Sequence, residues 1–159
     1  MKKLFLSAAA VTLLFASCKK DDDGGSSLNR KDQLMTGKWK ITAATVTSTI
    51  SGVSTTQDIF GLTDECNKDD LSIFKSDMHL ITDAGAVKCN SNDPQQEDAG
   101  TWALTDNDTK LAITESGSTE SSNIDQLDGS TLKISNTETM TQGGFTVTNK
   151  SSITFTHVN

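Results

Sequence analysis

Residues 37–47 read GKWKITAATVT. Trp39, Ile41 and Ala43 in this stretch alternate with two lysines and a threonine, which is a period of two residues. Successive side chains of a β-strand point to opposite faces, so this period is typical of a strand with one apolar face. The β-branched residues in the rest of the stretch favour the same structure. We therefore expect a strand that turns Trp39 and Ile41 toward a core.

The same alternation returns in short segments along the rest of the chain. Residues 48–56 either continue the first strand or pair back on it as a second one. We expect a loop or a single helical turn over residues 58–70. The further strands that we expect are residues 71–75, 78–82, 86–90, 100–105, 110–114, 122–127, 131–136, 145–148 and 151–158.

Tight turns join most of these strands into antiparallel hairpins. The turns are predicted at residues 76–77, 106–109, 128–129 and 149–150, and the Asp-Gly pair at 128–129 is a strong hairpin signal. An apolar sheet face must be covered by a second sheet or by closure of the sheet on itself, and closure also removes exposed edges. The sequence therefore predicts an all-β protein, an antiparallel up-and-down meander that closes into a small barrel of about eight strands.

The first seventeen residues have the three parts of a secretory signal peptide. Lys2 and Lys3 form the charged start, residues 4–15 the apolar core, and Ala16-Ser17 the small-residue exit. The apolar run is about twelve residues long, whereas a membrane-spanning helix needs roughly 20. We therefore expect residues 1–17 to be a signal peptide.

The signal runs directly into Cys18. Residues 15–18, FASC, resemble a bacterial lipoprotein box, with phenylalanine where leucine is usual. The resemblance implies cleavage before Cys18 and acyl chains, such as palmitate, on its amine and sulfur. Two or more acyl chains anchor a protein stably to a membrane, whereas one does so only marginally. The alternative is an ordinary signal peptide followed by a chance cysteine.

The rest of the chain divides into a tether and one domain. Residues 18–33 follow the lipoprotein box with charged, glycine and serine residues and almost nothing apolar, which is the composition of a flexible linker. Residues 34–159 form the folded domain. Loss of Lys2 and Lys3 with the signal changes the net charge from −7 to about −9. An acidic chain without a basic cluster argues against binding to nucleic acid.

The chain holds three cysteines, an odd number that asks for an explanation in a secreted protein. If Cys18 carries lipid, Cys66 and Cys89 remain as one pair. In an oxidising compartment we expect them to form a disulfide. A two-cysteine metal site is the alternative, although His79 and His157 show no ligand spacing with either cysteine.

The order of these motifs is similar to that of a known family. Gly37-Lys38-Trp39 opens the first strand, the segment from Cys66 to Phe74 follows, and Gly100-Thr101-Trp102 comes after Cys89. Gly-x-Trp at the start of a secreted eight-stranded meander resembles the lipocalin signature. Residues 34–158 resemble the lipocalin-like domains of Bacteroidetes lipoproteins. The resemblance implies a lipocalin-like topology. The chain departs from true lipocalins because it lacks a Thr-Asp-Tyr motif and a late arginine, Arg30 being its only one, so the resemblance does not by itself imply a lipocalin's ligand pocket.

The acidic residues that follow Cys18 bear on localisation. Residues 21–23 are three aspartates, and they resemble the signal that sends such lipoproteins to the outer leaflet. We therefore expect a lipid-anchored protein of the bacterial outer membrane that is exposed on the cell surface. The alternatives are a periplasm-facing protein and a plain solvated spacer.

No enzyme motif is evident. The chain has no Gly-x-Ser-x-Gly elbow and no phosphate-binding glycine loop, so we expect neither an enzyme nor a cofactor. Residues 106–108 lack the glycine and the glutamate of a calcium loop and are expected to form a hairpin turn. Asp69-Asp70, near Cys66, is expected to be an exposed acidic loop. We expect no metal site.

The barrel interior is the remaining candidate site. A barrel of about eight strands is either filled by its own side chains or just wide enough for one small ligand. The first case suits a protein-interaction module of the cell envelope, such as an inhibitor, adhesin or accessory subunit. The second suits a binding protein for a small apolar or amphipathic molecule. The residues expected to line such a cavity are Trp39, Ile41, Trp102, Leu104, Leu132, Ile134, Phe145 and Phe155. The alternative for Trp39 and Trp102 is a core position in which their large side chains plug one end of the barrel.

Overall fold

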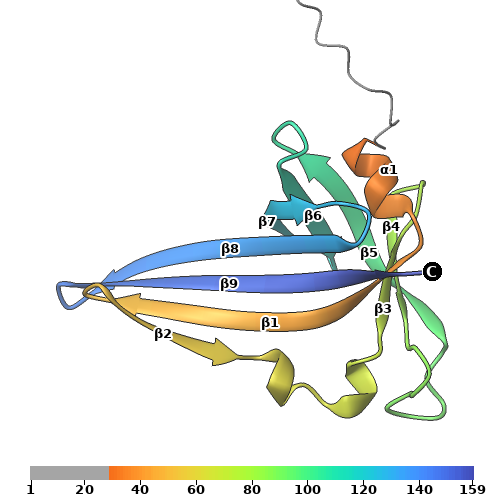
Figure 1. Cartoon of the computed structure of the whole chain (residues 1–159), viewed down its shortest axis with the longest axis horizontal. Coiled ribbons are helices and arrows are strands. Elements are labelled where there is room, and N and C mark those ends of the chain that lie inside the picture. Colours follow the sequence, from red (N-terminus) through yellow and green to blue (C-terminus); the bar gives the residue numbers. More distant parts are fainter. Residues whose placement is uncertain (1–28) are drawn as a thin grey trace, which may run out of the picture.

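The computed structural model of the protein describes residues 29–159 (Figure 1). The expected signal peptide, Cys18 and residues 18–28 of the expected tether lie outside the described residues. The elements are α1 (Arg30–Met35), β1 (Lys38–Ile50), β2 (Val53–Asp58), η1 (Phe60–Leu62), η2 (Glu65–Asn67), β3 (Leu71–Phe74), β4 (His79–Asp83), β5 (Gln96–Thr105), β6 (Lys110–Glu115), β7 (Ser118–Leu127), β8 (Thr131–Gln142) and β9 (Phe145–Val158).

The strands form one antiparallel sheet that closes on itself. Their order is β2-β1-β3-β4-β5-β6-β7-β8-β9, and β1 also pairs with β9. Eight strands, β1 and β3 to β9, therefore form a closed barrel, and β2 is added beside the distal half of β1. The prediction of an all-β up-and-down barrel of about eight strands is confirmed. Of residues 48–56, the first three continue the first strand and residues 53–56 pair back on it.

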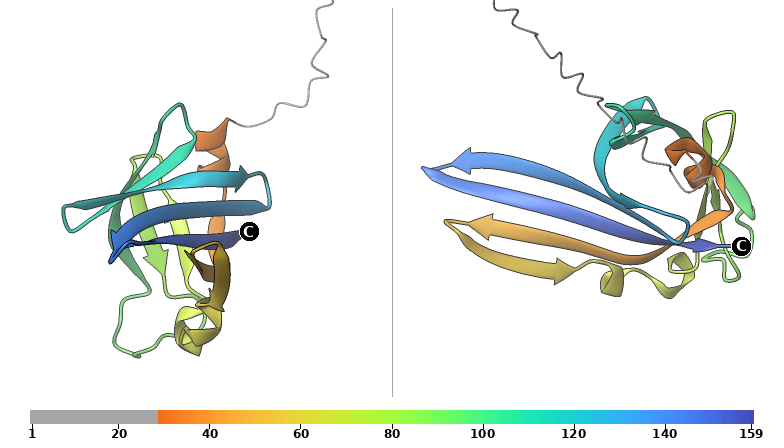
Figure 2. Two further views of the ribbon diagram at one scale, coloured as in Figure 1. Left: turned by 90° about the vertical axis from the view of Figure 1, so that its left-hand side faces the viewer. Right: turned by 45° about the horizontal axis from the view of Figure 1, so that its top comes forward.

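Three barrel strands, β1, β8 and β9, continue beyond the barrel, and β2 joins them there. β1 pairs with β3 only at Trp39 and Lys40, and from Thr45 onward the same edge pairs with β2. β8 leaves β7 after Ser135 and stays paired with β9 to its end. Residues 45–58 and 136–152 thus form a sheet that projects from the barrel, called the ribbon below (Figures 1 and 2).

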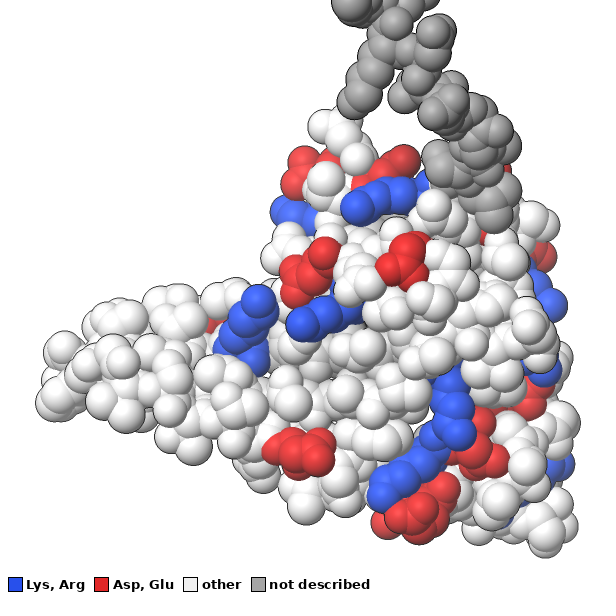
Figure 3. All heavy atoms as spheres, in the orientation of Figure 1, with Lys and Arg blue, Asp and Glu red and all other residues white. Residues whose placement is uncertain are grey.

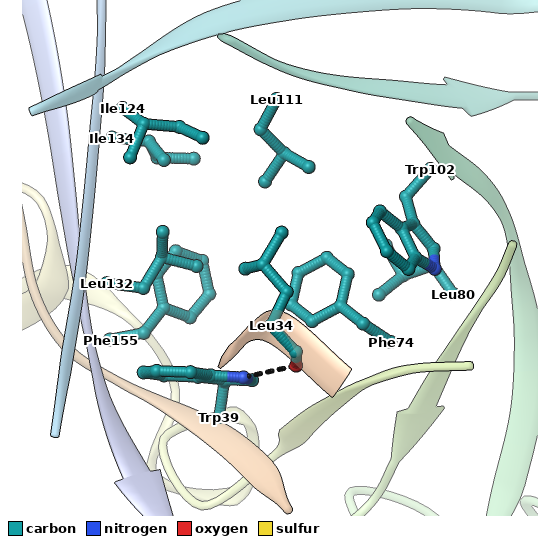
Figure 4. Packing of buried hydrophobic residues seen from close by; sticks show 10 residues of the cluster. All are labelled: Leu34, Trp39, Phe74, Leu80, Trp102, Leu111, Ile124, Leu132, Ile134 and Phe155. Atoms are coloured by element: carbon teal, nitrogen blue, oxygen red, sulfur yellow. Dashed lines mark hydrogen bonds between the residues drawn. The ribbon is translucent and has the colours of Figure 1, made fainter. Parts of the chain in front are cut away.

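The end of the barrel beside α1 is closed by buried side chains. Leu34 of α1 and Trp39 of β1 are fully buried, and the Trp39 Nε1–H donates a hydrogen bond to the Leu34 carbonyl oxygen at 2.8 Å (Figure 4). Phe74 and Trp102 meet edge to face with ring centroids 5.4 Å apart. Asn29 caps the start of α1, because its side-chain oxygen accepts a hydrogen bond from the backbone N–H of Asp32.

Both Gly-x-Trp motifs require their glycine. Gly37 has φ +70°, and a Cβ there would collide with the His157 ring and the Val158 carbonyl oxygen. Gly100 has φ +117°, and a Cβ there would collide with the Thr114 carbonyl oxygen. Only glycine adopts such conformations without strain and leaves this space. Each glycine lets a neighbouring strand approach just before a tryptophan enters the core.

The predicted hairpin across residues 149–150 is wrong. β9 runs unbroken from Phe145 to Val158, and Asn149 and Lys150 pair with β1 and β8 as ordinary strand residues. The turn lies instead at Gly143-Gly144, where both residues have positive φ. Two glycines accept this geometry more readily than Asn-Lys does. The displaced turn makes β8 and β9 long enough to form the ribbon.

Other boundaries also differ from the prediction; β7 begins four residues before the expected strand 122–127, and β8 ends six residues after the expected strand 131–136. Residues 86–90 form no strand, because this loop is held by the disulfide and by Asp69, whose Oδ2 accepts the N–H groups of Ala86 and Val87 at 2.7 and 3.0 Å. Residues 96–99, which lie between the expected strands 86–90 and 100–105, belong to β5. Residues 30–33, expected in the tether, belong to α1. The expected turn near Cys66 is present as η2.

Candidate ligand-binding site

A cavity opens at the end of the barrel away from Trp39. Its volume is about 530 Å³, and its lining comes mainly from β4 to β9 and the turn between β6 and β7. A second hollow of about 250 Å³ shares four of its lining residues and continues toward the ribbon along β7, β8 and β9. We call the two together the mouth cavity. The residues common to both hollows are Glu120, Ser122, Ile134 and Ile153.

The floor of the mouth cavity is apolar. Leu111 and Ile113 on β6 line it from one side, and Ile134 on β8 lines it from another (Leu111 and Ile134 are labelled in Figure 4). Leu80, Ile153 and Phe155 complete the floor. Strand periodicity explains this arrangement, because residues two apart on one strand share a face. β6 and β9 each contribute two such neighbours to the floor, and β8 contributes Ile134.

The rim of the mouth cavity is polar and acidic. Alternate residues of β6 line the cavity, and after Ile113 the next of them is Glu115. On β8 the alternate residues after Ile134 are Asn136 and Glu138. Glu120 on β7 lies directly opposite Ile113, and directly paired residues of an antiparallel sheet point to the same face. The rim glutamates, as we call Glu115, Glu120 and Glu138, are exposed to solvent. Polar groups therefore adjoin the apolar floor directly.

Of the residues expected to line a cavity, some line the mouth cavity, others lie in or against the buried core, and one lies on the ribbon. Ile134 and Phe155 do line the mouth cavity. Trp39, Trp102 and Leu132 are buried in the core cluster, and Ile41 and Leu104 pack against that cluster. Phe145 lies at the ribbon hairpin and is 62% exposed, far from the floor. Its placement on the cavity wall is therefore corrected, because the strand that carries it is longer than its pattern indicated.

Several lining residues were missed in the sequence. Leu111 and Ile113 belong to an expected strand, 110–114, but the strand was assigned no role in the cavity. Glu115 lies just beyond that expected strand, and Glu120 lies before the expected strand 122–127. The alternation Leu111, Ile113, Glu115 in residues 110–115, KLAITE, was the available signal.

Cys66 and Cys89 form the expected disulfide, with Cα atoms 5.1 Å apart. The two-cysteine metal site is therefore excluded. A hollow of about 170 Å³ beside the disulfide is lined by polar side chains, Asp70 among them. Burial, and then the charges of Asp69, Asp83 and Glu97, raise the pKa of Asp70. Within residues 29–159, no group of three or more His, Cys, Asp or Glu side chains is arranged to hold a metal ion.

A polar network lies near the closed end, apart from the mouth cavity. The Asp83 carboxylate is 5% exposed and accepts hydrogen bonds from Gln95 and Gln96 at 2.8 Å and from Lys38 Nζ at 2.9 Å. These hydrogen bonds, from Gln95 first, then Gln96 and Lys38, hold the pKa of Asp83 well below its usual range. Asp83 is therefore a structural carboxylate that ties β1 to β4 and β5.

Both histidines lie outside the mouth cavity lining. His157 Nε2 is 2.7 Å from the Thr36 carbonyl oxygen, and its ring meets Trp39 edge to face at 5.4 Å. His79 is exposed and lies 2.6 Å from Asp98. The Gly100 N–H and His79 lower the pKa of Asp98. The histidines therefore have local structural partners.

Among the helices of the described residues, none is both long and apolar enough to cross a membrane.

The sequence comparisons agree with this architecture. A family model described as a lipocalin-like domain matches residues 35–134, more than half of the chain. The match includes β1 to β7 and the beginning of β8. No curated protein matches the sequence.

Proposed function

The chain belongs to the lipocalin-like domain family, and from that premise we propose that it binds a small amphipathic ligand in the mouth cavity. The apolar part of the ligand lies on the floor formed by β6, β8 and β9, and its polar part meets the rim. The observation that carries this proposal is the change from apolar to polar side chains along each of these strands. The volume of about 530 Å³ is within the range of small-molecule sites.

The lining favours binding over catalysis. Serine and glutamate side chains are present, but the mouth cavity lining has no histidine, cysteine or lysine to pair with them as a base or nucleophile. Activation of a serine nucleophile depends on such a base within hydrogen-bonding distance. We therefore propose a binding protein without enzymatic activity. The open floor also favours a small ligand over the alternative function, a protein-interaction module with a filled barrel.

The site is testable with a neutral apolar fluorescent probe, N-phenyl-1-naphthylamine. We expect the probe to bind the protein with increased emission. Ile153→Trp places a large side chain on the floor and should weaken the probe's affinity about tenfold or more. Met140→Trp adds similar bulk on the exposed ribbon and serves as the matched control, with unchanged affinity. Circular dichroism checks that both variants fold. Equal affinity of Ile153→Trp and the control would contradict the proposed site.

We propose, further, that the protein is held at the bacterial outer membrane by lipid on Cys18, facing the cell surface. The support is the lipoprotein-box resemblance of residues 15–18 and the acidic residues after it. Intact-mass analysis of the protein from its native cells should show a chain that begins at Cys18 with acyl chains attached. Protease treatment of whole cells then distinguishes surface display from a periplasm-facing domain. An unmodified Cys18 in the mature protein would contradict the anchor.

A further inference from the structure

The rim glutamates lack protein partners. The lining of the mouth cavity contains Glu115, Glu120 and Glu138 and no lysine, arginine or histidine. Across residues 29–159, the ion pairs and side-chain hydrogen bonds involve other carboxylates and none of these three. All the formal charge in the lining is therefore negative and is not neutralised by the protein.

Carboxylates elsewhere on the barrel do find cations. Asp83 pairs with Lys38 at 2.9 Å, and Asp106 pairs with Lys110 at 3.2 Å. Lys150, which lies on the ribbon near the mouth, is 3.9 Å from Asp125 rather than beside a rim glutamate. Lys150 is thus engaged away from the rim glutamates. A concave site with one sign of charge concentrates its electrostatic field on whatever enters.

The rim glutamates are placed where a ligand's head group would lie. Glu120 is the direct cross-strand partner of Ile113, so one carboxylate stands beside the apolar floor. Glu138 follows Ile134 by four residues on β8, about 13 Å along the strand at the usual rise. An apolar chain lying on Ile134 and Ile153 would therefore bring its polar end among carboxylates. The floor and the rim are independent features, and they point to the two ends of one molecule.

From this arrangement, which rests on the proposed function, we propose that the mouth cavity selects amphipathic molecules with a positively charged head group, such as an alkyl amine or a quaternary ammonium compound. Anionic amphiphiles such as fatty acids would place their charge against three unneutralised glutamates and are disfavoured. A neutral head group would gain no ionic attraction. Exposed ion pairs are individually weak, so the preference comes from the sum of the three.

The test uses the full chain and three probes that share a twelve-carbon tail. Dodecyltrimethylammonium, dodecanol and dodecanoate differ in head-group charge, and each is titrated below its aggregation threshold to displace N-phenyl-1-naphthylamine. At low ionic strength we expect the cation to bind about tenfold more tightly than dodecanol, and dodecanoate to bind more weakly than dodecanol. High salt should reduce the difference, because screening weakens exposed charge interactions.

Two matched double variants separate the rim from overall charge. Glu120→Gln with Glu138→Gln should remove most of the cation preference and leave dodecanol binding unchanged. Asp64→Asn with Asp108→Asn changes the net charge equally at exposed positions outside the mouth cavity and should keep the preference. If dodecanol or dodecanoate binds as tightly as the cation, or if the rim variant keeps the preference, the inference is overturned while the binding function stands. If none of the three probes binds, the proposed function fails as well.

Discussion

The closed end of the barrel and the ribbon are built from the same two strands, β1 and β9, but they differ in burial. Trp39 at the closed end and Phe155 in the barrel interior are 0% and 8% exposed, whereas Ile50 and Phe145 on the ribbon are 48% and 62% exposed. At the closed end, α1 and the strands on the far side of the barrel cover the inner face. No described element covers the ribbon. Alternation thus forms a strand, but closure of the sheet decides whether its apolar face becomes core.

The ribbon is held together without a core. Its outer face carries hydroxyl pairs across strands, such as Thr47 with Thr56 at 2.8 Å and Thr139 with Thr148 at 3.3 Å. Its other face carries a group of exposed or partly exposed apolar residues at the tip of the ribbon. The strand pairing brings these residues next to one another. No charged residue occurs in segments 48–57 and 139–149, and the tip accordingly appears white in Figure 3. The apolar residues at the tip are Ile50, Val53, Met140, Phe145 and Val147.

The largest effect in this comparison is expected at Trp39. Trp39→Ala should lower the free energy of unfolding by about 3–5 kcal/mol, because it empties a fully buried site and removes the hydrogen bond to Leu34. Trp39→Phe retains most of the apolar contact and should cost less. Urea denaturation measures both changes. A cost below about 1 kcal/mol for Trp39→Ala would show that the closed end is not the stability centre.

Loss of the disulfide is expected to come next. Cys89→Ser should destabilise the domain by about 3 kcal/mol, because the unfolded chain loses a cross-link between positions 23 residues apart. The cross-link joins η2 to the loop before β5, on the barrel side. Hydrogen exchange at ribbon amides should therefore change less than exchange at amides of the loop around residues 84–95. Equal loss of protection in both regions would mean that barrel and ribbon unfold as one unit.

A smaller and pH-dependent effect is expected at Asp83. Asp83→Asn should cost about 2 kcal/mol at neutral pH, because a buried carboxylate with several donors loses its charge. The lowered pKa of Asp83 means that the unfolded chain binds this proton more readily, so the stabilisation is complete above the unfolded pKa of about 4 and declines as the pH falls below it.

The pH dependence is measured by thermal unfolding of both proteins from neutral to acidic pH. The wild type should lose stability more steeply than Asp83→Asn below about pH 4. Asp64→Asn, at an exposed position without such donors, is the control and should follow the wild type. Parallel curves for wild type and Asp83→Asn would contradict the role of this carboxylate.

The smallest effect is expected on the ribbon. Phe145→Ala should change stability by no more than about 0.5 kcal/mol, because the ring is already largely in water. Phe155→Ala, ten residues later on the same strand, removes the same group from the barrel interior and should cost about 3 kcal/mol. Urea denaturation of the two variants isolates the effect of burial, because the residue type and the strand are the same in both. Similar costs at the two positions would remove the contrast between ribbon and barrel.

Local patterns predicted much of the barrel but not its ends. The alternation around Trp39 and Trp102 was sufficient for strands, and the cysteine count was sufficient for the pairing. The six residues of α1 are too few for a helical stripe, although Leu34 covers the core. Asn149-Lys150 looks like a turn in isolation, yet its neighbours on both sides pair it into a strand. Long-range pairing prevailed over the local turn preference.

Local sequence patterns also predicted only part of the candidate site. Ile134 and Phe155 were expected on the cavity wall, and both line it. Glu115 and Glu120 could not be assigned to a rim, because their strands were drawn too short. Phe145 was also assigned to the wall, but a local pattern does not show how far a strand extends beyond the barrel.

The sequence by itself determined which segments are strands and that Cys66 and Cys89 form a pair, because these depend on side-chain alternation and on the chemistry of a few residues. Only the tertiary structure decided where the barrel ends and the ribbon begins, and which side chains line the mouth cavity. The physical reason is that covering a strand's apolar face takes partners distant in the chain. On β9 those partners are present at Phe155 and absent at Phe145.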